Sequence, residues 1–76
     1  MKMTKPEVKV YQAIKRHTDA WGWGLEESEI VEYTTFPRHI VSAALRGLGK
    51  RKLVGIKVSY VANHIFFNDL KWNPKS

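Results

Sequence analysis

The spacing of hydrophobic residues along the chain first predicts a helix over about residues 6–20. Val10 and Ile14 lie one helical turn apart within this segment. Pro6 suits the first turn of a helix, where its missing N–H costs nothing. The sequence Trp-Gly-Trp-Gly at 21–24 then ends the helix, because glycine permits turns that are closed to other residues.

Two further helices are predicted over about residues 26–33 and 37–49. The first begins with several glutamates, where the helix dipole favours negative charge. In the second, apolar residues at helical spacing form a stripe that suits a core, namely Ile40, Val41, Ala44, Leu45 and Leu48. The remaining face carries Arg38, His39, Ser42, Ala43 and Arg46. Ala43, Ala44 and Gly47 are small enough to let this helix approach a partner closely, although alanine also simply favours helices.

Two strands, over about residues 53–60 and 63–69, complete the pattern. Both segments are rich in β-branched and aromatic residues, and the short link between them predicts a hairpin. The link lacks glycine, which leaves its turn type open. A short strand or loop is expected near Trp23 and Leu25. Together these elements predict a single α+β domain over residues 1–76, with three helices followed by a C-terminal two-stranded β-hairpin.

The aromatic residues bear on where the core lies. Trp21 and Trp23 cannot both be exposed without cost, so we expect at least one of them to pack on the core or against a partner. We assign Ile65, Phe66 and Phe67 to core and sheet packing rather than to base stacking. A hydrophobic content of 43% is sufficient for one small core and argues against a disordered basic tail.

Charge changes this picture, because it is distributed unevenly. The chain has 13 lysines and arginines against 7 acids, a net charge of +6. No acid occurs between Glu32 and Asp69, whereas six cations do: Arg38, Arg46, Lys50, Arg51, Lys52 and Lys57. This stretch predicts a positive face that attracts polyanions, of which nucleic acid is the commonest. The alternative is a solvated helix end, where cations favour the dipole.

The composition gives little support to catalysis or metal binding. Cysteine is absent, which excludes disulfides and thiolate metal sites. The three histidines share no metal-ligand spacing, and no glycine-rich phosphate loop is present. We therefore expect no enzymatic activity, no cofactor and no metal. The longest apolar runs are far shorter than a membrane span, so we expect a cytoplasmic protein, or one of the host cytoplasm if it is viral.

The order of elements and one long run of residues resemble the winged helix-turn-helix family. Residues 29–48, EIVEYTTFPRHIVSAALRGL, look like the family pattern E-I-A-x-x-T-G-L-S-R-x-T-V-S-x-A-L-x-x-L. The basic segment Lys50-Arg51-Lys52-Leu53-Val54 stands where such proteins lead into the wing. Residues 21–33 are also similar to the first domain of phage replication-origin proteins, another winged-helix group.

This chain departs from the winged-helix pattern at three positions. The turn glycine is Thr35 here, and a left-handed backbone would strain a β-branched residue, so we expect the turn to differ in shape. The glycine that usually precedes the wing is Lys52. Pro37 replaces the more common serine, which removes a side-chain cap but fits the first helical turn.

The resemblance implies sequence-specific binding of double-stranded DNA, with helix 37–49 in the major groove. Near the start of that helix we expect contacts from Thr35, Arg38, His39, Ser42 and Ala43, with Arg38 suited to guanine O6 and N7. Phosphates are the expected partners of Arg46, Lys50 and Arg51. From the wing, we expect contacts by Lys57, Tyr60, Asn63 and His64.

Three roles remain open on this basis. The leading prediction is a small prokaryotic or viral transcription regulator that binds DNA as a homodimer. A phage or plasmid replication or recombination accessory protein would use the same surface. The third is a winged-helix module that binds another protein, for which the two indoles and the wing tip are candidate contacts.

Overall fold

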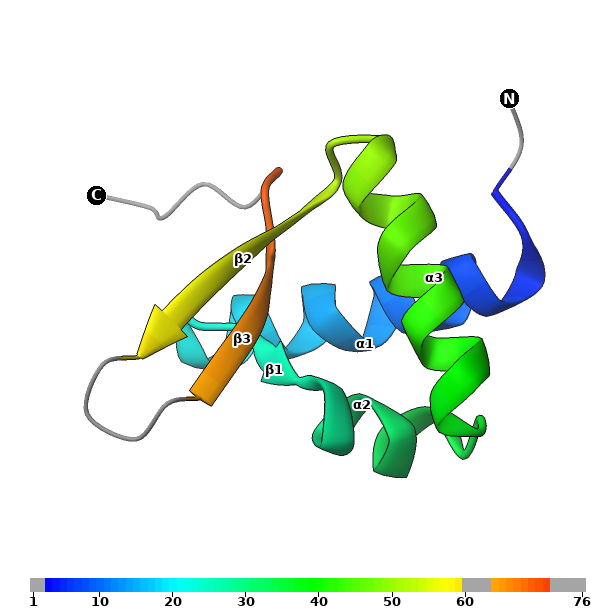
Figure 1. The fold of residues 1–76 in the computed structure, drawn as a ribbon. Helices are drawn as coiled ribbons and strands as arrows, with labels where there is room; N and C mark the ends of the chain where they lie inside the picture. The colour runs from blue at the N-terminus through cyan, green and yellow to red at the C-terminus, as the bar shows by residue number, and fades with distance from the viewer. Residues whose placement is uncertain (1–2, 60–63, 72–76) are drawn as a thin grey trace.

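The computed structural model describes residues 3–59 and 64–71, and within them the chain forms three helices and three strands. In chain order these are α1 (Lys5–Trp21), β1 (Leu25–Glu26), α2 (Glu27–Thr34), α3 (Arg38–Lys50), β2 (Val54–Ser59) and β3 (His64–Asp69). The α+β class and the three helices are confirmed, and each helix lies within one residue of its predicted bounds. The helices pack beside the sheet, with the outer ends of β2 and β3 extending away from them (Figure 1).

Local sequence signals define both ends of α1. The Thr4 side chain accepts a hydrogen bond from the Glu7 backbone, and the Glu7 carboxylate accepts one from the Thr4 backbone at 2.8 Å. This reciprocal pair satisfies two N–H groups that have no partner within the helix. At the other end, Gly22 adopts the left-handed conformation (φ 81°) and donates to the Thr18 carbonyl. The predicted end of the helix at this glycine is confirmed.

The sheet has three antiparallel strands in the order β1-β3-β2. The prediction of a two-stranded hairpin is therefore incomplete, because the short β1 pairs with β3 and places Leu25 opposite Phe67. Strands β2 and β3 pair throughout their length, from Val54 opposite Asp69 to Ser59 opposite His64. The short strand or loop expected near Trp23 and Leu25 is thus a two-residue strand, and its pairing with β3 defines it.

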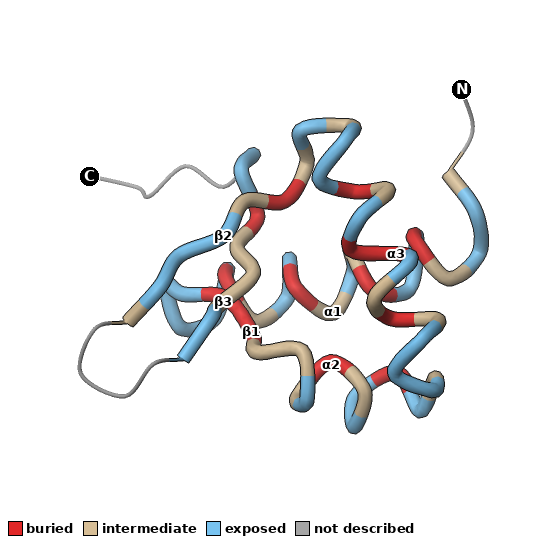
Figure 2. Tube along the Cα trace, viewed as in Figure 1, coloured by how far each residue is buried: buried red, intermediate tan, exposed pale blue. Residues whose placement is uncertain are grey.

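The core lies where the three helices meet the inner end of the sheet (Figure 2). Its buried hydrophobic residues are Val10, Ile14, Leu25, Ile30, Val41, Ala44, Leu45, Leu48 and Val54. All but one of the apolar positions predicted for α3 are buried, and Ile40 is half-buried. Phe67 packs against the core as expected, whereas Ile65 is 48% exposed because it lies where the sheet extends beyond the helices.

Trp21 and Trp23 are 61% and 52% exposed, which shows that neither packs on the core. The glycine-rich segment places both indoles on the surface, where their ring centroids lie 6.0 Å apart. The sequence led us to expect that at least one indole packs on the core or against a partner, and packing on the core is wrong for both. Contact with a partner is the alternative that remains.

Two turns that flank α3 use left-handed backbone at residues other than glycine. Thr35 has φ 60° and Lys52 has φ 59°, the two positive values among the described non-glycine residues. The expectation that the turn at Thr35 would differ in shape is wrong, since this residue adopts the conformation for which glycine is favoured. Its amide still donates to the Val31 carbonyl, and this bond closes α2.

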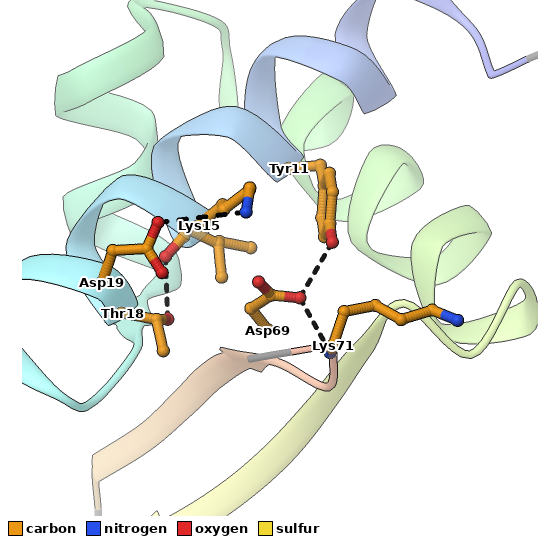
Figure 3. A network of polar contacts seen from close by, with 7 residues as sticks. Tyr11, Lys15, Thr18, Asp19, Asp69 and Lys71 are labelled. Carbon is orange, nitrogen blue, oxygen red and sulfur yellow. Dashed lines mark hydrogen bonds and ion pairs between the residues drawn. The ribbon is translucent and has the colours of Figure 1, made fainter. Parts of the chain in front are cut away.

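A polar contact holds the end of β3 against α1. The Tyr11 hydroxyl donates to Asp69 Oδ1 at 2.8 Å, and the Lys71 amide donates to the same oxygen at 3.0 Å (Figure 3). Asp69 is buried, and its other carboxylate oxygen has no partner among the described residues. Burial and the neighbouring carboxylate raise the pKa of Tyr11 to about 12. This contact fixes where the β2–β3 pair leaves the helical body.

Candidate nucleic-acid interface

The exposed face of α3 gathers half of the residues predicted to contact DNA. Successive helical residues turn by about 100°, so the core positions Val41, Ala44, Leu45 and Leu48 occupy one side of the helix. The opposite side carries Arg38, His39, Ser42, Ala43, Arg46 and Lys50. All six are exposed except Ser42, which is half-buried. The tertiary structure thus leaves this face uncovered.

No acid occurs in α3, and none of its cations forms an ion pair with another residue in the described part of the chain. The ion pairs found among residues 3–59 and 64–71 join Lys15 to Asp19, Arg51 to Glu7 and His64 to Glu26. Arg38, Arg46 and Lys50 take part in none of them. These three positive charges are therefore available to a polyanion that approaches the helix.

The start of α3 is shaped by the turn at residues 34–37. Pro37 is the N-cap residue and provides no side-chain hydrogen bond to the helix, as its substitution for serine predicted. The Thr34 hydroxyl, which is buried, accepts from the Phe36 amide at 3.3 Å. The Thr35 side chain is exposed, and its hydroxyl donates to the Thr34 carbonyl at 2.6 Å. Arg38 and His39 follow directly, in the first turn of α3.

Arg51 differs from its neighbours, because the structure brings it to an acid that is distant in sequence. Its Nε lies 3.5 Å from Glu7 Oε2, and the two side chains are only 24% and 8% exposed. The backbone hydrogen bond from Thr4, the Thr4 hydroxyl and Arg51 hold the pKa of Glu7 below its usual value, against the effect of burial. The sequence suggested that no acid neutralises the cations of residues 33–68, and for Arg51 this is wrong.

Gly47 also has a different role from the one its small size suggested. A Cβ atom at this position would lie 2.0 Å from Glu7 Oε2 and 3.0 Å from its Cδ. The missing side chain therefore makes room for the Glu7 carboxylate, not for an external partner. Ala44 is likewise buried in the core, so of the three small residues only Ala43 lies exposed on the outer face of α3.

The strands contribute fewer free polar groups than the sequence predicted. Lys57 is exposed in the middle of β2, opposite Phe66. His64 is exposed, but its Nδ1 lies 2.7 Å from Glu26 Oε1, which links β3 to the start of α2. The predicted contacts at Tyr60 and Asn63 lie outside the described residues.

A hollow beside Arg38 reveals acidic neighbours that sequence order conceals. The hollow has a volume of about 260 Å³ and is lined by Glu26, Glu27, Ser28, Arg38, His64, Ile65 and Phe67. The first turn of α2 thus places carboxylates close to the first residue of α3. These acids lower the positive potential beside Arg38, whereas Arg46 and Lys50 lie further along α3 and do not line the hollow.

The remaining chemistry of the described residues is sparse. In residues 3–59 and 64–71, no group of three or more His, Cys, Asp or Glu side chains is placed to hold a metal ion. Among the helices of these residues, none combines the length and hydropathy that crossing a membrane requires. Neither known protein-family models nor curated protein sequences show a match to this chain.

Proposed function

We propose that this chain is a small winged-helix protein that binds double-stranded DNA through the exposed face of α3. The observation that carries the proposal is the acid-free, solvent-exposed side of this helix, which presents Arg38, Arg46 and Lys50 without ion-pair partners among the described residues. An α-helix fits the major groove of B-DNA, where each base pair presents a distinct pattern of donors and acceptors.

The order of the elements supports the same proposal. The chain forms α1 and β1, then α2 and α3 joined by a three-residue turn, and then the paired strands β2 and β3. Strand β1 lies at the edge of the sheet, next to β3. This arrangement is compatible with a winged helix, in which α2 and α3 form the helix-turn-helix and β2 with β3 forms the wing. Thr35 and Lys52 both have left-handed backbone, and they stand at the two positions where the winged-helix pattern has glycine.

Within this proposal the residues of α3 divide into two groups. The N-terminal residues of a recognition helix lie nearest the base edges, so Arg38 and His39 would read bases, with Ser42 and Ala43 one turn further on. Arg38 would pair with guanine O6 and N7, a contact worth about 1–3 kcal/mol of discrimination. Arg46 and Lys50, nearer the end of the helix, would bind phosphates and fix the register.

One such domain reads few base pairs, and useful specificity would come from a dimer on half-sites about one helical turn apart. The chain would then act as a transcription regulator, by occupying DNA or by recruiting another protein. Arg51 is left out of the contact set because its guanidinium pairs with Glu7.

The proposal is tested by selecting bound sequences from a random duplex pool, followed by titrations of the selected duplex over a range of salt concentrations. Phosphate contacts by Arg46, Lys50 and Lys57 would give a log–log salt slope of about −2.7. Arg38→Ala should lose preference at one base, whereas Arg46→Ala should weaken all duplexes alike and reduce the slope by about 1. Lys15→Ala removes an exposed cation of α1 and is the matched control. A salt-independent signal, or equal binding by all four proteins, would refute the proposal.

A further inference from the structure

A second candidate surface lies on α1 and α2 and shares no residue with the exposed face of α3. A groove of about 420 Å³ runs between these helices. Lys9, Ala13, Arg16 and Ala20 line it along one side of α1, at positions separated by whole helical turns. Trp21 and Tyr33 line it too, and both are highly exposed, at 61% and 66%. Ala13 and Ala20 contribute small side chains to this lining, and the two aromatic rings contribute apolar surface.

The indole at one end of the groove is held in a cluster of three rings. Trp21 and Trp23 lie 6.0 Å apart with an interplanar angle of 39°, and His17 lies 6.4 Å and 6.1 Å from them. The Nδ1 atom of His17 also lies 2.8 Å from the Trp23 carbonyl oxygen, which ties the cluster to the backbone. The apolar surface is therefore positioned before any partner arrives, which lowers the entropic cost of binding.

The groove is also positively charged. Its lining includes Lys9 and Arg16 and contains no acid. Arg16 takes part in none of the ion pairs found in residues 3–59 and 64–71, and Lys9 lies 6.0 Å from the Phe36 ring. These two cations are seven residues apart, which corresponds to about 10 Å along a helix. The groove thus combines exposed aromatic surface with two spaced positive charges.

We propose that this groove binds an acidic segment of another protein that carries one large apolar side chain. The apolar side chain would lie over Ala13 and Ala20, between Trp21 and Tyr33, and carboxylates would meet Lys9 and Arg16. Carboxylates three residues apart in a polyproline-type segment lie on the same side and span about 9 Å, which matches the spacing of the cations. This inference stands independently of DNA binding by α3.

Two other occupants fit the observations less well. Single-stranded nucleic acid binds by stacking bases on open aromatic faces, whereas the two indoles are tilted against each other and against His17. A second copy of this chain would need a self-complementary patch. The lining offers cations on both sides of such a contact and no carboxylate to pair with them.

The experiment is a selection of peptides from a random displayed library on the intact protein, followed by titration of the selected peptides. The recovered sequences should share acids about three residues apart around a large apolar residue. Trp21→Ala should weaken their binding tenfold or more, as is usual for an aromatic residue that a partner covers at the centre of an interface. Arg16→Ala should weaken binding about two- to fivefold at low salt, and less at high salt. Lys15→Ala, on the same helix but outside the groove, should bind as the unmodified chain does.

Three results would overturn the proposal. The first is a selection without acidic enrichment, or selected peptides that bind Trp21→Ala and Arg16→Ala unchanged. The second is self-association, measured by sedimentation, that Trp21→Ala abolishes. The third is binding of a single-stranded oligonucleotide that depends on the same two residues.

Trp21 is exposed, so its substitution should leave the fold intact, which circular dichroism verifies. The Arg38→Ala protein should retain peptide binding, which separates this surface from that of α3.

Discussion

Substitution of Gly47 by alanine should destabilise the protein, although the same change stabilises most helices. Alanine is favoured over glycine inside a helix by about 1 kcal/mol. At this position, however, the new Cβ would lie 2.0 Å from Glu7 Oε2, which forces the carboxylate to move. The carboxylate cannot move freely, because it accepts from the Thr4 amide at 2.8 Å and pairs with Arg51 at 3.5 Å.

The magnitude follows from the contacts that would be lost. The hydrogen bond from the Thr4 amide to the Glu7 carboxylate is a bond to a charged group and contributes about 1.5–3 kcal/mol. The ion pair with Arg51 adds a smaller amount, because the arginine is partly exposed. After subtraction of the helix-propensity gain, Gly47→Ala should lower the free energy of unfolding by about 1–3 kcal/mol.

The sign of the effect should reverse when Glu7 is removed. In a Glu7→Ala background the obstruction is gone, so Gly47→Ala should raise stability by about 0.5–1 kcal/mol. The measurement is urea unfolding followed by tryptophan fluorescence, analysed as a double-mutant cycle with an expected coupling of about 1.5–4 kcal/mol. Gly49→Ala is the control, since a Cβ at that position would have no neighbour within 4 Å and the change should be stabilising in both backgrounds. If Gly47→Ala shifts stability in the same direction with and without Glu7, the assigned contact is wrong.

Three further predictions concern the same fold. Tyr11→Phe leaves Asp69 without its hydroxyl donor and should cost about 1–3 kcal/mol at pH 7. The folded pKa of Tyr11 is raised from 10.0 to about 12, so the stability that the hydroxyl contributes is complete below pH 10 and is lost as the pH rises through 12. The difference in unfolding free energy between wild type and Tyr11→Phe should therefore shrink over that range. A constant difference would contradict the assignment. Thr35→Gly should stabilise the protein by about 0.5–1 kcal/mol, since it relieves left-handed backbone at a β-branched residue, and no gain in the urea midpoint would argue against strain there. Glu7→Gln should make the stability of the protein less sensitive to acid. The pKa of Glu7 is lowered in the folded state, so its carboxylate contributes stability above pH 4.5 that is lost as the pH falls through the folded pKa. Identical acid unfolding of the two proteins would exclude this role.

The helices and their inner faces could be predicted because they depend on interactions between residues close in sequence. The apolar stripe of α3 marks which side is buried, and by exclusion which side is left to Arg38, His39 and Arg46. The capping box at Thr4 and the left-handed Gly22 are equally local. The stripe repeats at every turn and each cap lies within one turn of a helix end, so these signals can be recognised in a single sequence without knowledge of the other elements.

The candidate site could be predicted only in part, because charge pairing depends on distance in space. Glu7 precedes Arg51 by 44 residues, and no local pattern indicates that the two meet. The same holds for His64 with Glu26, and for the acids beside Arg38. The groove on α1 and α2 was also missed as a unit, although the outward position of its cations follows from helical spacing.

The sequence by itself determined which segments become helices and strands, where the first helix ends, and which side of residues 38–50 carries positive charge. Only the tertiary structure decided which of those charges remain unpaired, that Gly47 accommodates a carboxylate, and that two indoles stay on the surface. The physical reason is one of range: helical periodicity and capping act within about one turn, whereas burial and ion pairing depend on which distant segments the fold brings into contact.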